Sequence, residues 1–215
     1  MSRFLLLPGN NTLSHVAKCL AIRQVLLARG HEVHLAVSPR RASFLSGLGI
    51  RPLYTLPDLG DGDGSPAPTL GWFRPRRVIA CVEAEVTLIR QLRPDRVLGV
   101  FRFTGAISAG LSDVPYDSLV CGAMTRVCNE TLGFNADEAG ADEQAAALAF
   151  FRSAGARRMA PALAHFGLTG IDDLWQLLEA ERTFLWDTPR FQPLAPQHHL
   201  THVGPLQWNV WPDSD

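Results

Sequence analysis

The sequence predicts an α/β protein, a Rossmann-like three-layer sandwich with a mostly parallel sheet, from three observations. Short apolar runs typical of buried strands alternate with longer runs of helical periodicity. Glycine or proline closes several helical runs, as at Gly30, Gly49 and Pro94. The chain has 215 residues, of which 47% are hydrophobic, so it can bury a sizeable core. Because the strands and helices alternate, right-handed crossovers are expected to place helices on both faces of the sheet.

The N-terminal segment sets this pattern. An apolar strand ends at Pro8, a polar loop covers residues 9–14, and an amphipathic helix is predicted from about His15 to Arg29. The same unit continues with a strand over 32–37, a helix over 39–48 and a strand over 50–54.

The alternation continues through the remainder of the chain. Strands are predicted over 96–100, 116–120 and 183–186, and helices over 76–92, 104–111, 142–166 and 171–181. Residues 55–72 are rich in Gly, Pro and Asp and predict an exposed loop, residues 122–140 lack a clear period, and no regular element is predicted after residue 187.

Composition excludes several classes of function. Twenty basic residues against 21 acidic ones give a net charge of −1, so no field of one sign would attract nucleic acid or anionic lipid. No run of 18 apolar residues predicts a membrane span, and the N-terminal apolar run is too short for a secretory signal. The four cysteines form no C-x-x-C pair and fit reduced core thiols, which predicts a cytoplasmic protein.

Motifs for cofactors and metals are missing from the sequence. The loop PGNNTLSH lacks both the glycine spacing of a dinucleotide fingerprint and the G-K-[ST] of a P-loop, and neither G-x-S-x-G nor H-E-x-x-H occurs. Asp61 and Asp63 suggest a calcium loop, but Pro66 and Trp72 stand where an EF-hand needs Gly and Glu. The C-terminal histidines, which are expected to face solvent, are His198, His199 and His202. We therefore predict no metal and no cofactor.

His15 is the candidate general base. It stands at the start of the first helix, just after a loop at the carboxyl end of a strand, where open α/β sheets bind their ligands. A helix N-terminus favours a neutral imidazole over a charged one. The alternative interpretation is a polar residue that lies beside the first helical turn without a catalytic role.

Several segments, taken in order, carry a resemblance to a known family. They are L-L-A-R-G-H-E-V at 26–33, R-P-D-R-V at 93–97, G-x-F-R at 99–102, D-V-P-Y at 113–116 and V-G-P-L-Q-W at 203–208. Together with the histidine at the first helix, they resemble the N-terminal domain of GT-B fold glycosyltransferases of the macrolide and UDP-glucuronosyltransferase type. The first segment is weak alone, whereas the ordered set covers nearly the whole chain.

The resemblance implies a chemistry for His15. In that family a nucleotide-activated sugar is transferred to an acceptor hydroxyl with inversion, and the histidine matching His15 removes the hydroxyl proton. A later aspartate commonly orients that histidine. At the matching position this chain has Val100, so His15 would lack its usual carboxylate partner.

The resemblance also predicts the domain organisation. Residues 1–208 would form the acceptor-binding domain, and residues 209–215 would begin an interdomain linker. The C-terminal domain, which holds most contacts to the nucleotide-sugar donor in the family, would lie outside this chain. The chain alone is therefore not expected to turn over, and its uncovered apolar cleft would favour self-association. The alternative is a non-catalytic auxiliary protein that keeps this half-fold to bind an apolar ligand or a partner enzyme.

Two groups of residues are predicted to contact a small lipophilic acceptor. Polar candidates lie in the first loop, and an alternative role for them is to stabilise that turn; they are Asn10, Asn11 and Thr12. Apolar candidates follow the strands, with ordinary core filling as their alternative role; they are Trp72, Phe73, Phe101, Phe103, Met124 and Phe134. Trp72 and Phe73 look the least core-like, because they follow a stretch rich in Gly and Pro.

Overall fold

The computed structural model describes residues 1–60, 68–128 and 139–208, and these residues form one seven-stranded sheet. Every strand pair is parallel, in the order β3-β2-β1-β4-β5-β6-β7. The strands are β1 (Arg3–Pro8), β2 (Glu32–Val37), β3 (Leu53–Thr55), β4 (Arg96–Val100), β5 (Tyr116–Val120), β6 (Arg182–Leu185) and β7 (Leu200–His202). The predicted Rossmann-like parallel sheet is thus confirmed.

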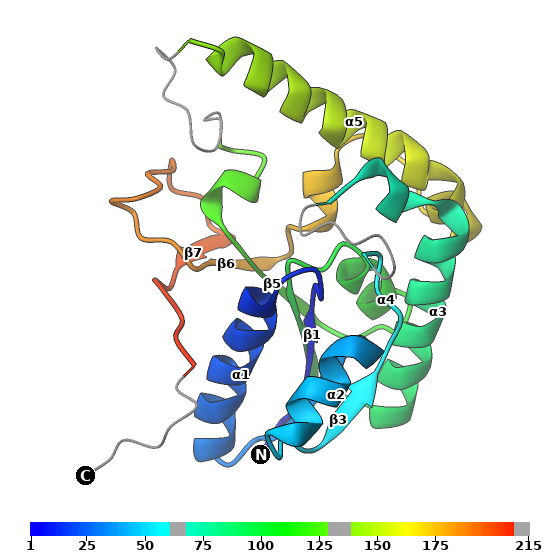
Figure 1. The fold of residues 1–215 in the computed structure, drawn as a ribbon, viewed down its shortest axis with the longest axis vertical. Helices are drawn as coiled ribbons and strands as arrows, with labels where there is room; N and C mark the ends of the chain where they lie inside the picture. The colour runs from blue at the N-terminus through cyan, green and yellow to red at the C-terminus, as the bar shows by residue number, and fades with distance from the viewer. Residues whose placement is uncertain (61–67, 129–138, 209–215) are drawn as a thin grey trace.

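Helices cover both faces of the sheet, as Figure 1 shows. In the described residues they are α1 (Leu13–Ala28), α2 (Pro39–Gly47), α3 (Pro75–Leu92), α4 (Gly105–Gly110) and α5 (Ala141–His165), with the short 3₁₀ helices η1 (Leu70–Phe73), η2 (Gly122–Met124) and η3 (Leu174–Leu177). None of the helices in the described residues is both long and apolar enough to cross a membrane.

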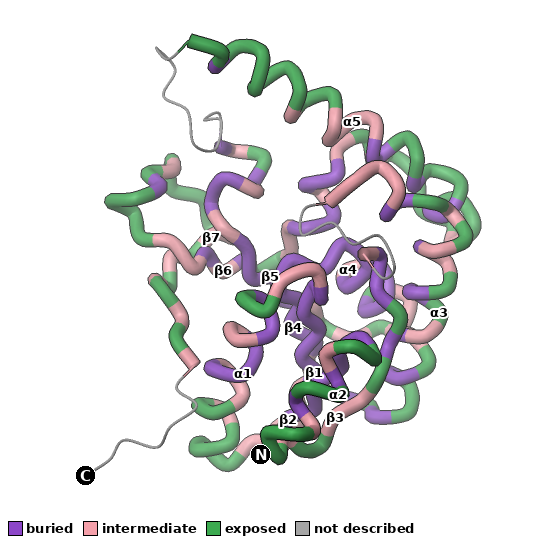
Figure 2. Tube along the Cα trace, in the orientation of Figure 1, coloured by how far each residue is buried: buried purple, intermediate pink, exposed green. Residues whose placement is uncertain are grey.

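Successive side chains of β1 point to opposite faces of the sheet and belong to two different apolar clusters. Leu6 belongs to the apolar cluster beneath α1 and α2, whereas Leu5 and Leu7 belong to a cluster with Leu88 and Ile89 of α3. All three β1 leucines are 0–1% exposed. In Figure 2 the buried residues accordingly follow the central strands, with exposed residues on the outer turns of the helices. The central strands are therefore fixed from both faces, which makes their carboxyl ends a rigid support for loops.

Two predictions for the C-terminal part of the chain were wrong. The helix predicted over 171–181 is reduced to the single turn η3, whose cap is the Asp173 carboxylate, a hydrogen-bond acceptor from the Trp175 amide. The apolar residues of this turn are all buried in the core, so tertiary packing holds the segment. It lacks the single buried face of an amphipathic helix. The tail contains the unpredicted strand β7, which adds to β6 as a three-residue edge strand.

The segment before α3 also differs from the expected exposed loop. Residues 70–73 form η1, and the side chains of Trp72 and Phe73 are 2% and 0% exposed. Gly60 packs so closely against the Trp72 indole that an added Cβ would lie 2.9 Å from its ring. The glycine- and proline-rich composition does not indicate this packing, because the contact joins Gly60 and Trp72 from opposite ends of the segment.

The contact of α5 with η3 predicts a sharp packing effect. An added Cβ at Gly155 of α5 would clash with Leu174 Cδ1 and lie 2.9 Å from Leu174 Cγ. We expect Gly155→Ala to lower the free energy of unfolding by about 1–3 kcal/mol through overpacking. Urea denaturation of the chain measures this change. The matched control is Gly110→Ala in α4, where a Cβ meets nothing within 4 Å, and we expect it to be neutral or stabilising by about 0.4–1 kcal/mol. Equal effects of the two substitutions would contradict the packing argument.

Candidate active site

The candidate site lies at the carboxyl edge of the sheet, where the loops after β1, β3 and β4 meet. Because all strands are parallel, their carboxyl ends share one edge, and this is the edge where α/β sheets bind ligands. Backbone hydrogen bonds join the loops directly: the Gly9 amide donates to the Val100 carbonyl over 2.8 Å. The side chain of His15, in the first turn of α1, faces this junction.

The hydrogen bonds of His15 define its tautomer. Its Nδ1 lies 3.2 Å from the Gly9 carbonyl oxygen and 3.2 Å from Asn11 Oδ1. A carbonyl oxygen only accepts, so Nδ1 carries the proton and donates it. The lone pair of the neutral imidazole is then on Nε2, which receives no hydrogen bond from the residues that the structure describes. The arrangement therefore leaves Nε2 as the nitrogen able to take up a proton.

The surroundings of His15 keep the imidazole neutral. The pKa of His15 is lowered from 6.5 to about 4, mainly by burial and also by the Lys18 charge, whereas the bond to Gly9 and the charge of Asp58 act in the opposite direction. The side chain is 8% exposed, and its ring centroid lies 4.9 Å from that of Phe101 and 5.9 Å from that of Trp186. At neutral pH, His15 is thus an unprotonated base in an aromatic environment.

Gly9 is required by the close approach of two loops. A Cβ at this position would lie 2.5 Å from the Phe101 carbonyl oxygen and 3.5 Å from His15 Nδ1. Phe101 itself has a left-handed φ of 51°, an uncommon conformation for a bulky residue, and it turns the chain sharply after β4. The backbone at this junction is therefore closely constrained on both sides.

A buried ion cluster lies directly behind the junction. The Arg102 guanidinium, 4% exposed, bonds to the carboxylates of Asp58 and Glu85, which are 5% and 0% exposed. Thr104 and Ser108 hydroxyls donate to Glu85, and Arg102 also donates to the carbonyls of Pro8 and Pro57. This cluster ties the loops after β1, β3 and β4 to helix α3.

The charges in this cluster stabilise one another. Burial alone would disfavour the charged form of Arg102, but the Glu85 and Asp58 carboxylates raise its pKa above the usual range. Burial likewise opposes ionisation of Asp58, but the Arg102 charge and the Asn10 hydrogen bonds lower its pKa below the usual value. Arg102 and Asp58 are therefore ionised at neutral pH.

Val100 stands where the resemblance places an orienting aspartate. It ends β4, is fully buried, and belongs to the apolar cluster beneath α1 together with Val16, the residue after His15. In the described parts of the chain, no carboxylate accepts a hydrogen bond from His15; the Gly9 carbonyl and the Asn11 side chain do so instead.

A second group of side chains lies one helical turn along α1. The Lys18 ammonium is 4.4 Å from the ring centroid of Trp186, which follows β6. Burial lowers the pKa of Lys18, and the nearby Cys121 and Asp187 oppose that change. Asp187 in turn accepts a hydrogen bond of 2.6 Å from the Gly122 amide. These contacts connect the ends of β5 and β6 to the helix that carries His15.

The predicted apolar acceptor residues are largely buried. Phe101 and Phe103 are 3% and 2% exposed, and their rings lie 5.2 Å apart in a cluster that also contains Trp72 and Phe73. Met124 is partly exposed and packs against the same cluster, whereas Phe134 lies outside the described residues. Acceptor contact by these six residues stays a prediction.

The three polar loop residues have different environments. Asn10 is buried; its side-chain amide donates to Pro8 and Asp58 and accepts from the Ser38 amide. Asn11 and Thr12 are partly exposed, and the Thr12 hydroxyl lies 2.8 Å from that of Ser14. Asn10 thus has a clear structural role, while acceptor contact for all three residues stays a prediction.

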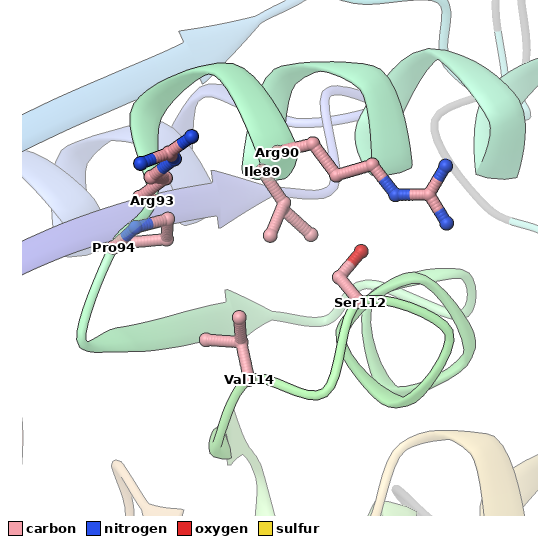
Figure 3. Close-up of a pocket in the computed structure, with 6 residues that line it drawn as sticks. All are labelled: Ile89, Arg90, Arg93, Pro94, Ser112 and Val114. Carbon is pink, nitrogen blue, oxygen red and sulfur yellow. The ribbon is translucent and has the colours of Figure 1, made fainter.

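Two other features lie away from His15. An open pocket is lined by Ile89, Arg90, Arg93, Pro94, Ser112 and Val114 (Figure 3). Its residues precede β4 and β5, so it lies at the amino edge of the sheet, opposite His15. Among the described residues, no group of three or more His, Cys, Asp or Glu side chains could hold a metal. In the tail, His199 lies 3.7 Å from Glu179, and His202 Nδ1 lies 3.2 Å from the Asp187 carbonyl oxygen.

Several solved structures with the same fold are glycosyltransferases. The glycosyltransferase of kitacinnamycin has a TM-score of 0.65 at 19% identity, with 94% of this chain and 51% of that chain covered. The calicheamicin glycosyltransferase CalG4 has a TM-score of 0.64 at 17% identity, with 95% of this chain and 53% of that chain covered. The glycosyltransferase SsfS6 of Streptomyces sp. SF2575 has a TM-score of 0.57 at 21% identity, with 94% of this chain and 53% of that chain covered. The chain thus has the fold of the N-terminal half of a GT-B glycosyltransferase.

A curated sequence relative agrees with this fold. The PGL/p-HBAD biosynthesis rhamnosyltransferase of Mycobacterium bovis (strain BCG / Pasteur 1173P2) is 32% identical over 111 residues, which is 49% of this chain and 23% of the relative. Proteins of the same name from two Mycobacterium tuberculosis strains match equally. The chain therefore aligns with less than a quarter of these relatives and with about half of the solved structures. No protein-family model matches it.

The ion cluster was missed at the sequence level, although one signal was present. Glu85 occupies the buried stripe of α3 together with Val78, Val82, Ile89 and Leu92. An acidic residue in such a stripe needs a buried partner. The sequence places its partner Arg102 in the G-x-F-R segment and predicts an exposed loop around Asp58, so neither residue is marked as buried.

The pKa of His15 predicts a pH-dependent loss of stability. Between pH 6.5 and about 4, an unfolded His15 binds a proton that the folded one does not, so stability falls as the pH falls. The full shift corresponds to about 3 kcal/mol. We expect the unfolding free energy of the wild type minus that of His15→Gln to decrease by about this amount between pH 7 and pH 4. Urea titrations at a series of pH values measure this difference. The contributions of the other histidines cancel, because both proteins contain them. A constant difference would contradict the assigned burial of a neutral imidazole.

Proposed function

We propose that this chain is the acceptor-binding domain of an inverting glycosyltransferase that transfers a sugar from a nucleotide-sugar donor to a hydroxyl of a small lipophilic acceptor. The observation that carries the proposal is the hydrogen bond from His15 Nδ1 to Gly9, because it leaves Nε2 unprotonated at the carboxyl edge of the sheet. The fold shared with the glycosyltransferases named above supports the reaction class.

The proposed chemistry is a single displacement. Nε2 of His15 takes the proton of the acceptor hydroxyl while the oxygen attacks the anomeric carbon of the donor. The bond from that carbon to the nucleotide diphosphate breaks, the diphosphate leaves with the bonding electron pair, and the configuration inverts. The buried imidazole of His15 is already neutral at physiological pH, so Nε2 can accept the proton without first losing one.

The donor side of the proposal relies on a second domain. The solved structures are about twice as long as this chain, so a C-terminal donor-binding domain is the proposed partner. The rhamnosyltransferase name of the curated relative makes a nucleotide-activated rhamnose the first donor to test. The proposal places the reaction in the cytoplasm, where nucleotide-activated sugars are available.

The acceptor side of the proposal relies on the residues around His15. Phe101 and Trp186 are the aromatic neighbours of the imidazole, with ring centroids within 6 Å of it. Asn11, whose Oδ1 lies 3.2 Å from His15 Nδ1, and Thr12 belong to the first loop and are only partly buried. Together these groups would hold the apolar body of an acceptor and orient its hydroxyl toward Nε2.

Removal of the base tests the proposal. In the full-length protein, we expect His15→Gln to lower kcat for sugar transfer by about 10²–10⁴-fold with little change in KM, because the loss affects proton transfer. The wild-type rate should stay level at neutral pH and fall as the pH falls through about 4, where Nε2 becomes protonated. Product formation from a nucleotide-activated rhamnose and a panel of lipophilic alcohols and phenols provides the measurement.

The exposed histidine of α5 supplies the control. His165→Gln changes a side chain that is 53% exposed at the end of that helix, and transfer should be unaffected. Undiminished transfer by His15→Gln would show that His15 is not the base. Absence of transfer by the wild type with every donor, combined with binding of a lipophilic ligand, would favour the non-catalytic auxiliary protein.

A further inference from the structure

We propose that Asp58 is a positioning residue that orients His15 through the peptide bond between Gly9 and Asn10, in place of the side-chain carboxylate that Val100 cannot supply. The inference rests on the proposed role of His15 as general base. It concerns a residue that follows β3 and has no direct hydrogen bond to the imidazole among the contacts of the described residues.

The geometry joins the two residues through one planar group. The Gly9 carbonyl and the Asn10 amide N–H belong to the same peptide unit. The carbonyl oxygen of that unit accepts from His15 Nδ1 over 3.2 Å, and its N–H donates to Asp58 Oδ2 over 3.1 Å. The hydrogen bonds therefore connect, in order, the Asp58 carboxylate, the Asn10 N–H, the Gly9 carbonyl and the His15 imidazole N–H.

The electronic structure of an amide makes this order directional. A carboxylate that accepts from the amide N–H increases the electron density on the conjugated carbonyl oxygen, which becomes a better hydrogen-bond acceptor. A stronger acceptor at Gly9 favours the tautomer of His15 with the proton on Nδ1. It also stabilises the imidazolium that forms when Nε2 takes a proton. A backbone carbonyl is a known partner of functional histidines, and here it is coupled to a negative charge.

The carboxylate of Asp58 is fixed in the orientation that the link needs. Its Oδ2 also accepts from the Asn10 side-chain amide over 2.8 Å and from Arg102, while Oδ1 accepts from the Gly60 amide over 3.1 Å. Arg102 is in turn held by Glu85 over 2.6 Å. Both oxygens are therefore occupied by donors from separate segments, and the carboxylate cannot turn away from the Asn10 amide.

The electrostatics around His15 agree with this geometry. The charged groups that act on the imidazole are Lys18, from its own helix, and Asp58, from the loop after β3. Asp58 is the one whose negative charge favours a proton on the ring. Arg102 is the shared partner of both carboxylates of the cluster.

A matched pair of substitutions separates this role from a purely structural one. Asp58→Asn and Glu85→Gln each convert a buried carboxylate bonded to Arg102 into its isosteric amide, but only Asp58 contacts the Asn10 amide. The readout is the ratio of the two neutral tautomers of His15, from the ¹⁵N shifts of its ring in the ¹⁵N-histidine-labelled chain at pH 7. The His15→Gln spectrum assigns the signal.

We expect Asp58→Asn to lower the ratio of the Nδ1–H to the Nε2–H tautomer at least threefold, and Glu85→Gln to leave it within a factor of 1.5. In the full-length protein, Asp58→Asn should lower kcat by about 10–100-fold with little change in KM. An unchanged ratio in a folded Asp58→Asn chain, or equal changes in both variants, would overturn the inference.

The wild type provides a measurement that needs no variant. Because the Asn10 amide lies between Asp58 and the imidazole, its ¹⁵N shift should follow the titration of His15, with the same midpoint. If Asp58→Asn does not fold, an Asn10 amide that fails to respond to this titration overturns the inference.

The two proposals fail in different ways. Loss of sugar transfer in His15→Gln with an unchanged tautomer ratio in Asp58→Asn would contradict the orienting role of Asp58 and support His15 as the base. A changed tautomer ratio in Asp58→Asn combined with full transfer by His15→Gln would support the orienting role of Asp58 and contradict His15 as the base.

Discussion

The constraint on which this site depends is the burial of one guanidinium between two carboxylates. Arg102 joins Asp58 and Glu85 at positions that are 5% exposed or less, so each charge requires its partners. Breaking such a buried pair by removing one member typically costs about 3–5 kcal/mol. The loops after β1, β3 and β4 are therefore not independent surface segments, because all three supply hydrogen bonds to the same cluster.

This cluster accounts for the precision of the backbone around His15. Gly9 contacts the Phe101 carbonyl so closely that a side chain is excluded, and the Asn10 side chain is bonded to Ser38, which follows β2, and to Asp58, which follows β3. The imidazole then faces a carbonyl whose position cannot relax. A rigid acceptor of this kind selects one tautomer at little entropic cost, as the supporting shell of a catalytic group must do.

Much of the fold could be predicted from the sequence, because strands and helices of a doubly wound protein carry local periodicity. The strands from Arg3 to Leu185 and the helices α1 to α5 follow apolar patterns bounded by Gly or Pro. The errors arose where tertiary contacts override the local pattern. The turn η3 is buried all round, and β7 has only three residues paired with β6.

The site was predictable only in part, and for a related reason. The position of His15 after a βα loop is a local feature, so the sequence predicts that position, while its role as a base stays a prediction. The partners of that histidine are determined by contacts across long separations: Asn10 to Asp58 spans 48 residues, and Arg102 to Asp58 spans 44. The resemblance pointed to Val100, one residue from Phe101, as the place of the carboxylate, but a negative charge enters the same junction from the loop after β3.

A carboxylate that acts through a peptide is not equivalent to one that contacts the imidazole directly. A direct carboxylate adds a full charge at hydrogen-bond distance, whereas the Gly9 carbonyl presents a dipole that Asp58 polarises. The weaker field fits the low pKa of about 4 for His15, since burial remains the largest effect on it. It also explains why Val100 is tolerated: with Asp58 supplying orientation, the end of β4 is free to complete the apolar cluster beneath α1. In the proposed mechanism, orientation of the base and packing of the helix that carries it are thereby assigned to different segments of the same sheet edge, the loop after β3 and the end of β4.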